Sequence, residues 1–307
     1  MDQSPRLSIV VPCFNEAPCV EAFVRAVDAT GVAGVEFVFV DDGSTDETLP
    51  IVKRLADADS RIRYVSFSRN FGKESALLAG LRKSSGAIVV TMDVDLQDPP
   101  ALLPEMLRAI EEEGFDCVAT RRTSREGEPP VRSWFARRFY WLMRHFSDVA
   151  LVDGARDYRM MTRQVVEAIL ALTEVNRFTK GIYQWVGFRT KWIAFPNVER
   201  TAGQTKWSFR KLFLYSLEGI MAFSTAPLQL ASWLGVLCCG AAFLALGVIF
   251  FRALLFGDPV SGWPSLACII IFLGGLQLFF TGVLGAYLAK TYLETKHRPL
   301  YIAREEH

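Results

Sequence analysis

The first half of the chain alternates short runs of β-branched and aromatic residues with longer segments whose apolar residues recur at helical spacing. The short runs predict strands, at 7–11, 36–40, 63–67 and 87–92. The segments between them predict helices, at 17–30, 46–57 and 73–84. Regular alternation of strand and helix is typical of a mostly parallel sheet with helices on both faces. We therefore predict a Rossmann-like α/β domain, to which we assign residues 1–210.

Two runs in the last third of the chain contain no Asp, Glu, Lys or Arg, at 227–251 and 264–289. Each is long enough to cross the roughly 30 Å hydrocarbon core of a bilayer as a helix. Buried helices of a soluble protein are the alternative, but two such runs separated by a short turn-rich stretch are unusual in a globular core. The segment 211–226 has an apolar face directly before the first run, which predicts an interfacial amphipathic helix.

The distribution of basic residues predicts the topology of the two transmembrane helices. The tail 290–307 carries four Lys or Arg residues, whereas Arg252 is the one basic residue between the two apolar runs. Positive charge concentrates on the cytoplasmic side of a membrane. The apolar run 7–11 is also too short for a signal peptide. We therefore place the α/β domain and both termini on the cytoplasmic side of the inner (plasma) membrane.

Composition and motifs argue against several classes of partner and enzyme. A net charge of +1 gives no reason to expect a nucleic-acid partner. Arginines crowd the stretch 121–144, which suits either a solvated face or anionic lipid headgroups. The six cysteines form no Cys-x-x-Cys pair, so a zinc site is not predicted. The Gly-x-Gly-x-x-Gly and Walker A patterns are absent, which argues against dinucleotide oxidoreductases and P-loop enzymes.

Polar residues cluster directly after three of the predicted strands. Asn15 and Glu16 follow the first strand, the segment 41–46 follows the second, and Asp93 and Asp95 follow the fourth. Ligands of such sheets bind at the carboxyl ends of the strands. Three polar clusters at one sheet edge therefore predict a binding site.

Asp93 and Asp95 suggest what this site holds. Their carboxylate oxygens suit a hard divalent cation, and Mg²⁺ or Mn²⁺ would keep other coordination positions for phosphate oxygens and water. Such a metal neutralises the charge that develops on a diphosphate leaving group. The segment 41–46 has two interpretations. It is either a turn that runs into a helix cap at Thr45 or Asp46, or a source of a carboxylate that accepts a hydrogen bond from a nucleobase.

Several segments, in the same order along the chain, resemble the motifs of family 2 glycosyltransferases with the GT-A fold: Val10–Glu16, Asp41–Asp46, Ser68–Lys73 and Asp93–Pro100. Later segments resemble the branch that includes dolichol-phosphate mannose synthase and bactoprenol glucosyltransferases: Asp157–Met161, Arg177–Gly181 and Arg200–Trp207. The resemblance covers nearly the whole chain. It implies a GT-A catalytic domain followed by interfacial and transmembrane helices.

The resemblance also implies roles for individual residues. The nucleoside pocket would be lined by Pro12, Phe14, Glu16 and Asp42. The diphosphate and the metal would be surrounded by Asp93, Val94, Asp95 and Gln97, with Asp95 and Asp93 as candidate metal ligands and Asp95 the first choice. Phosphate groups would be held by Arg121, Arg200 and Lys206, and Asp157 would lie near the reacting centre. The alternatives are ordinary exposed basic residues and, for Asp157, a surface ion pair with Arg156 or Arg159.

The implied reaction is inverting transfer of a hexose from a nucleotide-sugar to undecaprenyl or another polyisoprenyl phosphate at the cytoplasmic membrane face. UDP-glucose is the first choice of donor, and UDP-N-acetylglucosamine, GDP-mannose and a UDP-aminoarabinose remain open. A lipid monophosphate is already largely ionised near neutral pH and needs no strong base. We therefore expect Asp157 to orient groups or contact the metal. The resemblance further implies a homo-oligomer, a tetramer in relatives, and a flippase acting downstream.

Two other functions were weighed. A processive polysaccharide synthase shares the early motifs, but it needs more membrane helices and a Gln-x-x-Arg-Trp motif that this sequence lacks. A non-catalytic nucleotide-binding membrane scaffold is the alternative of another class. The intact Asp93-x-Asp95 pair speaks against that scaffold. A measurement of product formation would distinguish the scaffold from an enzyme.

Overall fold

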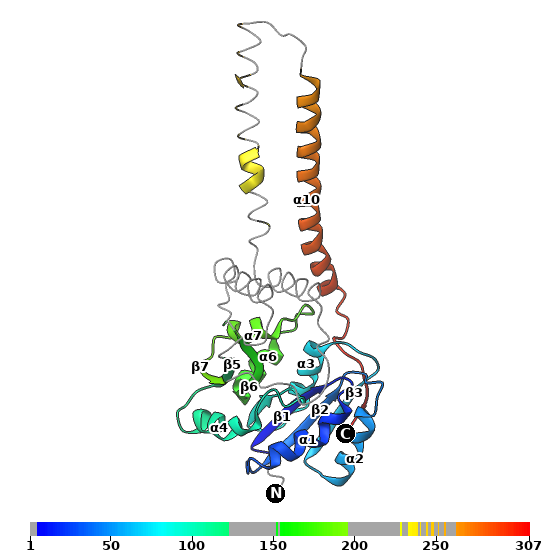
Figure 1. Ribbon diagram of the computed structural model, residues 1–307, viewed down its shortest axis with the longest axis vertical. Coiled ribbons are helices and arrows are strands. Elements are labelled where there is room, and N and C mark those ends of the chain that lie inside the picture. The colour runs from blue at the N-terminus through cyan, green and yellow to red at the C-terminus, as the bar shows by residue number, and fades with distance from the viewer. Residues whose placement is uncertain are drawn as a thin grey trace.

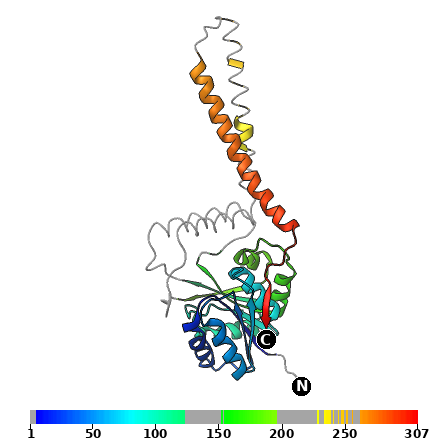
Figure 2. The ribbon, with the colours of Figure 1, turned by 90° about the vertical axis from the view of Figure 1, so that its right-hand side faces the viewer.

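The computed structural model describes residues 5–122, 152, 154–195 and 262–307, with single positions and short pieces between 228 and 255. The described residues form an α/β domain and one long helix, α10 (Trp263–Thr295), that stands off from it (Figure 1). After α10 the chain returns to the domain and ends beside the sheet (Figure 2).

The centre of the domain is an eight-stranded sheet of order β7-β5-β6-β4-β1-β2-β3-β8. In chain order its strands are β1 (Leu7–Cys13), β2 (Val35–Asp41), β3 (Ile62–Phe67), β4 (Ile88–Thr91), β5 (Cys117–Arg122), β6 (Ala155–Thr162), β7 (Thr190–Phe195) and β8 (Ala303–Glu306). The first four are mutually parallel, whereas β6 and β8 run against their neighbours. The predicted Rossmann-like, mostly parallel sheet is confirmed.

The helices of the domain cover both faces of the sheet. They are α1 (Ala17–Asp28), α2 (Thr48–Ala58), α3 (Lys73–Lys83), the short 3₁₀ turn η1 (Pro100–Leu102), α4 (Leu103–Glu111), α6 (Arg163–Ala171) and α7 (Thr179–Trp185). Every strand and helix predicted between residues 7 and 92 is present, and each end agrees with the prediction to within two residues.

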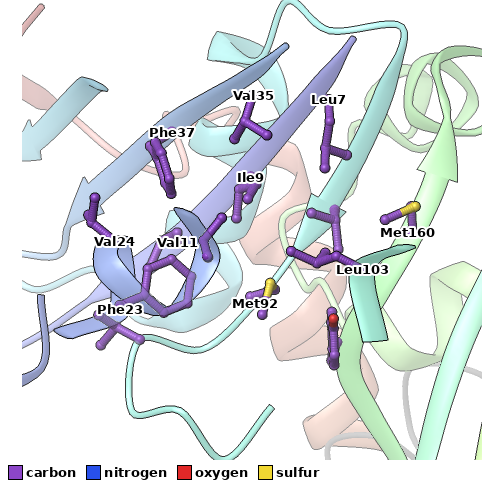
Figure 3. Packing of buried hydrophobic residues seen from close by; sticks show 14 of the residues in the cluster. Leu7, Ile9, Val11, Phe23, Val24, Val35, Phe37, Met92, Leu103 and Met160 are labelled. Carbon is purple, nitrogen blue, oxygen red and sulfur yellow. The ribbon is translucent and has the colours of Figure 1, made fainter. Parts of the chain in front are cut away.

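Burial on both faces explains why the central strands read as continuous apolar runs. Alternate residues of β1, among them Ile9 and Val11, pack with Phe23 of α1 and Leu103 of α4 on one face (Figure 3). The intervening Val10 packs toward the other face. There α3 approaches so closely that a Cβ added at Gly80 would lie 2.2 Å from the Cγ1 atom of Val10. This packing fixes where each strand ends, and so where the polar loops lie.

Glu36 is a buried carboxylate at the opposite end of the sheet from the polar loops. It accepts hydrogen bonds from the Ser8 hydroxyl and from the amide and hydroxyl of Ser85, and it lies 3.4 Å from Arg63. Burial alone raises the pKa of Glu36, but these hydrogen bonds and Arg63 outweigh it and hold the pKa below the ordinary 4.5. Its ionised form therefore stabilises the fold.

We expect Glu36→Gln to lower the free energy of unfolding near pH 7 by about 1–3 kcal/mol, because charge-assisted hydrogen bonds are lost. The folded pKa is depressed, so this stabilisation is present above pH 4.5 and is lost as the pH falls through the folded pKa. Thermal unfolding in detergent should be measured near pH 7 and in acid. The difference in unfolding midpoint between variant and wild type should shrink as the pH falls. Glu112→Gln, on an exposed position, is the control. Equal midpoints for Glu36→Gln and wild type near pH 7 would contradict the prediction.

Among the described residues, α10 is the one helix that is long and apolar enough to cross a membrane, over Phe272–Thr295. It contains the predicted second span, 264–289, and continues beyond it to Thr295. The predicted interfacial helix 211–226 lies outside the described residues, as does most of the predicted first span 227–251. A second crossing therefore stays a prediction.

The tail beyond α10 is part of the sheet, which the sequence did not reveal. β8 pairs antiparallel with β3 and forms the outer edge of the sheet. Tyr301 stacks on Phe67 with ring centroids 4.9 Å apart, and the imidazole of His307 stacks on Tyr64 at 5.7 Å. The last residues of the chain are thus bound to β3 of the α/β domain.

Candidate active site

The loops after β1 and β2 are tied together at the carboxyl edge of the sheet. The Asn15 carboxamide oxygen accepts a hydrogen bond from the Thr45 amide at 2.8 Å, and the Thr48 hydroxyl accepts one from the Glu16 amide at 2.9 Å. Asn15 adopts a φ of 56°, which turns the chain sharply after the strand. The predicted residues Pro12, Phe14 and Glu16, all half-buried, therefore border the segment 41–46.

Asp42 is oriented toward the protein backbone. Its carboxylate accepts hydrogen bonds from the amides of Phe71 at 2.6 Å and Gly72 at 3.0 Å. Burial raises the pKa of Asp42, although these two amides oppose the rise. Gly43 has a φ of 70°, and a Cβ there would lie 2.5 Å from the backbone of Arg69. The turn after β2 thus holds the loop that leads into α3.

The two interpretations of the segment 41–46 can now be compared with its contacts. Asp46 accepts the Thr48 amide at 3.0 Å, although the residue directly before α2 is Glu47, which makes no side-chain capping hydrogen bond. The Asp41 carboxylate accepts the Ser66 hydroxyl at 2.8 Å and the Ser44 amide at 3.0 Å. Both acids therefore have structural partners, and contact of Asp42 with a nucleobase stays a prediction.

The loop after β4 presents its carboxylates in a tight turn. Asp95 is 8% exposed and accepts the amide of Gln97 at 3.2 Å, and Leu96 between them has a φ of 58°. The side chain of Val94 is buried. The turn therefore sets the oxygen atoms of Asp93, Asp95 and Gln97 on one short loop.

Asp98 and Arg156 hold this turn in place. The two side chains form an ion pair at 3.1 Å, and Asp98 also accepts the Asp93 amide at 3.3 Å. Burial raises the pKa of Asp98 to about 6, and Arg156 opposes the rise. The sequence analysis did not single out Asp98, although it stands inside the motif Asp93–Pro100.

Lys73 joins Asp93, which was predicted to surround the diphosphate and metal, to Asp157, which was predicted to lie near the reacting centre. Its ammonium group lies 2.7 Å from the Asp93 carboxylate and 2.7 Å from the Asp157 carboxylate. β6 runs antiparallel to β4, so it begins at the edge where β4 ends and brings Asp157 toward Asp93. Lys73 is the first residue of α3. Three elements therefore meet at one ammonium group.

Asp157 is ionised and held by cations. Its side chain is 22% exposed, and Lys180 lies 4.0 Å away on its other side. Burial alone raises the pKa of Asp157, but Lys73, Lys180 and Arg156 outweigh it and the pKa is lowered. A carboxylate with a lowered pKa is a weak general base near neutral pH. The surface pair with Arg156 or Arg159 that was the alternative is not formed.

Of the three predicted phosphate-binding residues, the structure describes Arg121. Arg121 is exposed at the end of β5, where its Cα pairs with Ala155 of β6, two residues before Asp157. Arg200 and Lys206 lie outside the described residues. Lys73, Arg156 and Lys180 are site residues to which the sequence analysis gave no role. Lys73 ends one of the motifs quoted above and Lys180 lies within another, which is the signal that pointed to them.

Comparison with known proteins places this geometry in a family. The model of glycosyl transferase family 2 matches residues 8–170, which hold Lys73 and the site acids Asp42, Asp93, Asp95, Asp98 and Asp157. The chain belongs to this family. The transferase is 41% identical over 304 residues to a bactoprenol glucosyl transferase of Shigella phage SfV, covering 98% of this chain and 99% of that one. It is 40% identical over 302 residues to a prophage bactoprenol glucosyl transferase homolog of Escherichia coli K12, covering 97% and 98%.

A solved structure also resembles the transferase. It is the mannosyltransferase from Pyrobaculum calidifontis in complex with GDP-Man and Mn²⁺, with a TM-score of 0.47 and 18% identity. The match covers 95% of this chain and 87% of that one. A similarity of this size says nothing about the ligands of this glycosyltransferase.

Proposed function

We propose that this glycosyltransferase moves a hexose, with inversion, from a nucleotide-sugar to the phosphate of a polyisoprenyl lipid, for which undecaprenyl phosphate is the first choice. The observation that carries the proposal is the clamping of Asp157 between Lys73 and Lys180. A sugar or serine hydroxyl acceptor needs a general base, and an ionised carboxylate in two ion pairs is poorly suited to that task. A phosphate acceptor needs no base, and the lysines favour its charge. The two relatives, named as bactoprenol glucosyl transferases, agree with such an acceptor.

UDP-glucose is the proposed donor, because the relatives named above are glucosyl transferases. The nucleoside would lie between the loops after β1 and β2, against Pro12, Phe14, Glu16 and Asp42. UDP-N-acetylglucosamine, GDP-mannose and a UDP-aminoarabinose remain the alternative donors. Arg121, Arg200 and Lys206 are proposed to hold phosphate groups of the donor or of the lipid.

A divalent metal fits the residues of the β4 loop. Asp93, Asp95 and Gln97 offer hard oxygen atoms on one short turn, which suit Mg²⁺ or Mn²⁺. The described residues contain no group of three or more acids, histidines or cysteines arranged around a metal. Asp95, assisted by Asp93, would therefore supply part of a coordination shell that the diphosphate and water complete. When bound, the metal would neutralise the charge of the departing diphosphate.

This shared coordination predicts that metal affinity depends on nucleotide. We expect Mn²⁺ to bind the purified protein at least about tenfold more tightly with UDP present than without it, since the diphosphate supplies the missing ligands. Electron paramagnetic resonance of free Mn²⁺ measures both affinities without any turnover. Equal affinities with and without UDP would contradict a metal held jointly by protein and donor.

Asp157→Asn tests whether Asp157 orients or acts as a base. We expect turnover within about tenfold of wild type, because a general base would account for a loss of about 10²–10⁴-fold. Asp157→Ala, which also removes the side-chain oxygens, should lose more. Initial rates at saturating donor measure both variants. A loss of several orders of magnitude in Asp157→Asn would show that Asp157 is a required base.

The anchor completes the proposal. A lipid phosphate lies at headgroup level, so the site must be held against the cytoplasmic leaflet. We propose two transmembrane helices, at 227–251 and 264–289, with an interfacial helix at 211–226 and both termini in the cytoplasm. α10 supports the second of these spans by length and composition. A homo-oligomer, with a tetramer as first choice, and a flippase for the product belong to the same proposal.

A transfer assay tests the function. Purified full-length protein is incubated with undecaprenyl phosphate, Mg²⁺ or Mn²⁺, and one labelled UDP- or GDP-sugar at a time. Label that enters the organic phase with one donor, and that EDTA prevents, would support the reaction and identify the sugar. No lipid-linked label with any donor would overturn the proposed acceptor.

A further inference from the structure

The end of α10 is bonded directly to a loop of the catalytic domain. The Glu294 carboxylate accepts hydrogen bonds from the amide of Val175 at 2.9 Å and from the amide of Asn176 at 3.0 Å. Glu294 is one residue before the end of α10, and the two amides lie in the loop between α6 and α7. A helix that fits a membrane span thus holds a loop of the α/β domain through hydrogen bonds from two backbone amides to one side chain.

That loop leads straight into residues that face the reacting centre. Thr179, at the start of α7, donates its amide and its hydroxyl to the half-buried Glu74 carboxylate of α3. The next residue is Lys180, whose ammonium lies 4.0 Å from Asp157 and donates to the Ala155 carbonyl at 3.3 Å. Three residues therefore separate the anchored Asn176 from a cation of the site. A shift of the loop would move Lys180 relative to Asp157.

The chain that follows α10 also contacts α3, the helix that carries Lys73. The Leu300 carbonyl accepts the Ser75 hydroxyl at 3.0 Å, and the Ile302 carbonyl accepts the Ser68 amide at 3.0 Å. Ser75 lies two residues after Lys73 in α3. The tail therefore packs against α3 while Glu294 holds the loop before α7. Both helices lie at the end of the domain nearest α10 (Figure 1).

We infer that Glu294 is a positioning residue for the acceptor side of the reaction. Through the loop at 175–176 it holds Lys180 beside Asp157, at a fixed place relative to the membrane helix. The inference rests on the proposed transfer to a lipid phosphate. The hydrogen bonds of Glu294 go to the amides of Val175 and Asn176, in the loop before α7, and the donor-side loops follow β1 and β2. Loss of this anchor should therefore impair use of the lipid and spare binding of the nucleotide.

The test compares full-length wild type with Glu294→Ala and Glu294→Gln. In Glu294→Ala both amides lose their acceptor, so hydrogen exchange across 173–181 should be faster by about tenfold or more. kcat/KM for undecaprenyl phosphate should fall by about tenfold, since misplacement of a positioning group is costly. Affinity for UDP should stay within about twofold. Glu294→Gln keeps one oxygen acceptor and should recover part of both losses.

Glu306→Ala is the matched control, because it removes an acid of the same tail that pairs with Lys83 at 3.1 Å and has no contact with the loop. It should match wild type in exchange across 173–181 and in kinetics. Wild-type exchange and kinetics in Glu294→Ala would overturn the inference while leaving the proposed function intact. An equal loss of UDP affinity in Glu294→Ala would also overturn it. Absence of product with the wild-type enzyme would instead overturn the proposed function, and the inference with it.

Discussion

Asp95→Ala is expected to lower sugar transfer by about 10³-fold or more, because it removes the proposed direct ligand of the metal that neutralises the departing diphosphate. The nearly buried Asp95 carboxylate holds the Gln97 amide, so the substitution also loosens the turn that carries the other oxygen donors. The rate of label transfer to lipid at saturating donor measures the loss. Mn²⁺ affinity in the presence of UDP should fall in the same variant.

The control separates this effect from a general loss of fold. Asp28→Ala removes an exposed acid that pairs with Arg61 at 2.9 Å at the C-terminal end of α1, and it should keep nearly full activity. Asp95→Asn keeps the shape of the side chain and one oxygen, and it should be impaired less than Asp95→Ala. If Asp95→Ala retained both transfer and Mn²⁺ affinity, the metal would have to be held elsewhere.

Lys73→Met is expected to lower transfer by about 10²–10³-fold, and it tests a residue that the sequence motifs left without a role. The ammonium neutralises Asp93 and Asp157 at 2.7 Å each. Without it two carboxylates face each other where two further anions, donor diphosphate and lipid phosphate, must meet. The loss should appear mainly in kcat, since charge between reacting groups matters most in the transition state.

Lys73→Arg keeps the charge and should be impaired less than Lys73→Met, although its planar group cannot reproduce the geometry of the ammonium. Lys191→Met is the control, because it breaks a surface ion pair with Glu113 at 2.7 Å outside the site. Kinetics with varied donor and varied lipid separate kcat from KM. Full activity in Lys73→Met would show that the contacts of Lys73 with the two acids serve stability alone.

The first half of the fold followed from local pattern. The helices between Leu7 and Thr91 form because apolar residues recur at helical spacing and bury one face of each helix, whereas the central strands are continuous apolar runs that are buried on both faces. The polar segments after β1, β2 and β4 could be assigned to one edge because parallel strands place their carboxyl ends together. The acids at 93 and 95 were therefore predictable as neighbours of the loops after β1 and β2.

Contacts between distant segments were not predictable in this way. Lys73 and Asp157 are 84 residues apart, and they meet because β6 inserts antiparallel beside β4. No periodicity in the sequence encodes which strand pairs with which. The orientation of Asp42 toward the amides of Phe71 and Gly72 likewise depends on how two loops pack. The motifs marked these residues as important and left their partners unnamed.

The tail shows the same division most clearly. Its composition predicts a polar, basic end to the chain, and β8 is only four residues long, which is too short for a periodic signal. It becomes a strand because the edge of β3 offers unpaired backbone groups and the side chains of Phe67 and Tyr64 offer stacking surfaces. Local sequence thus sets which elements form. Packing between elements far apart in the chain decides which charges meet, and here it joins the site to the end of α10.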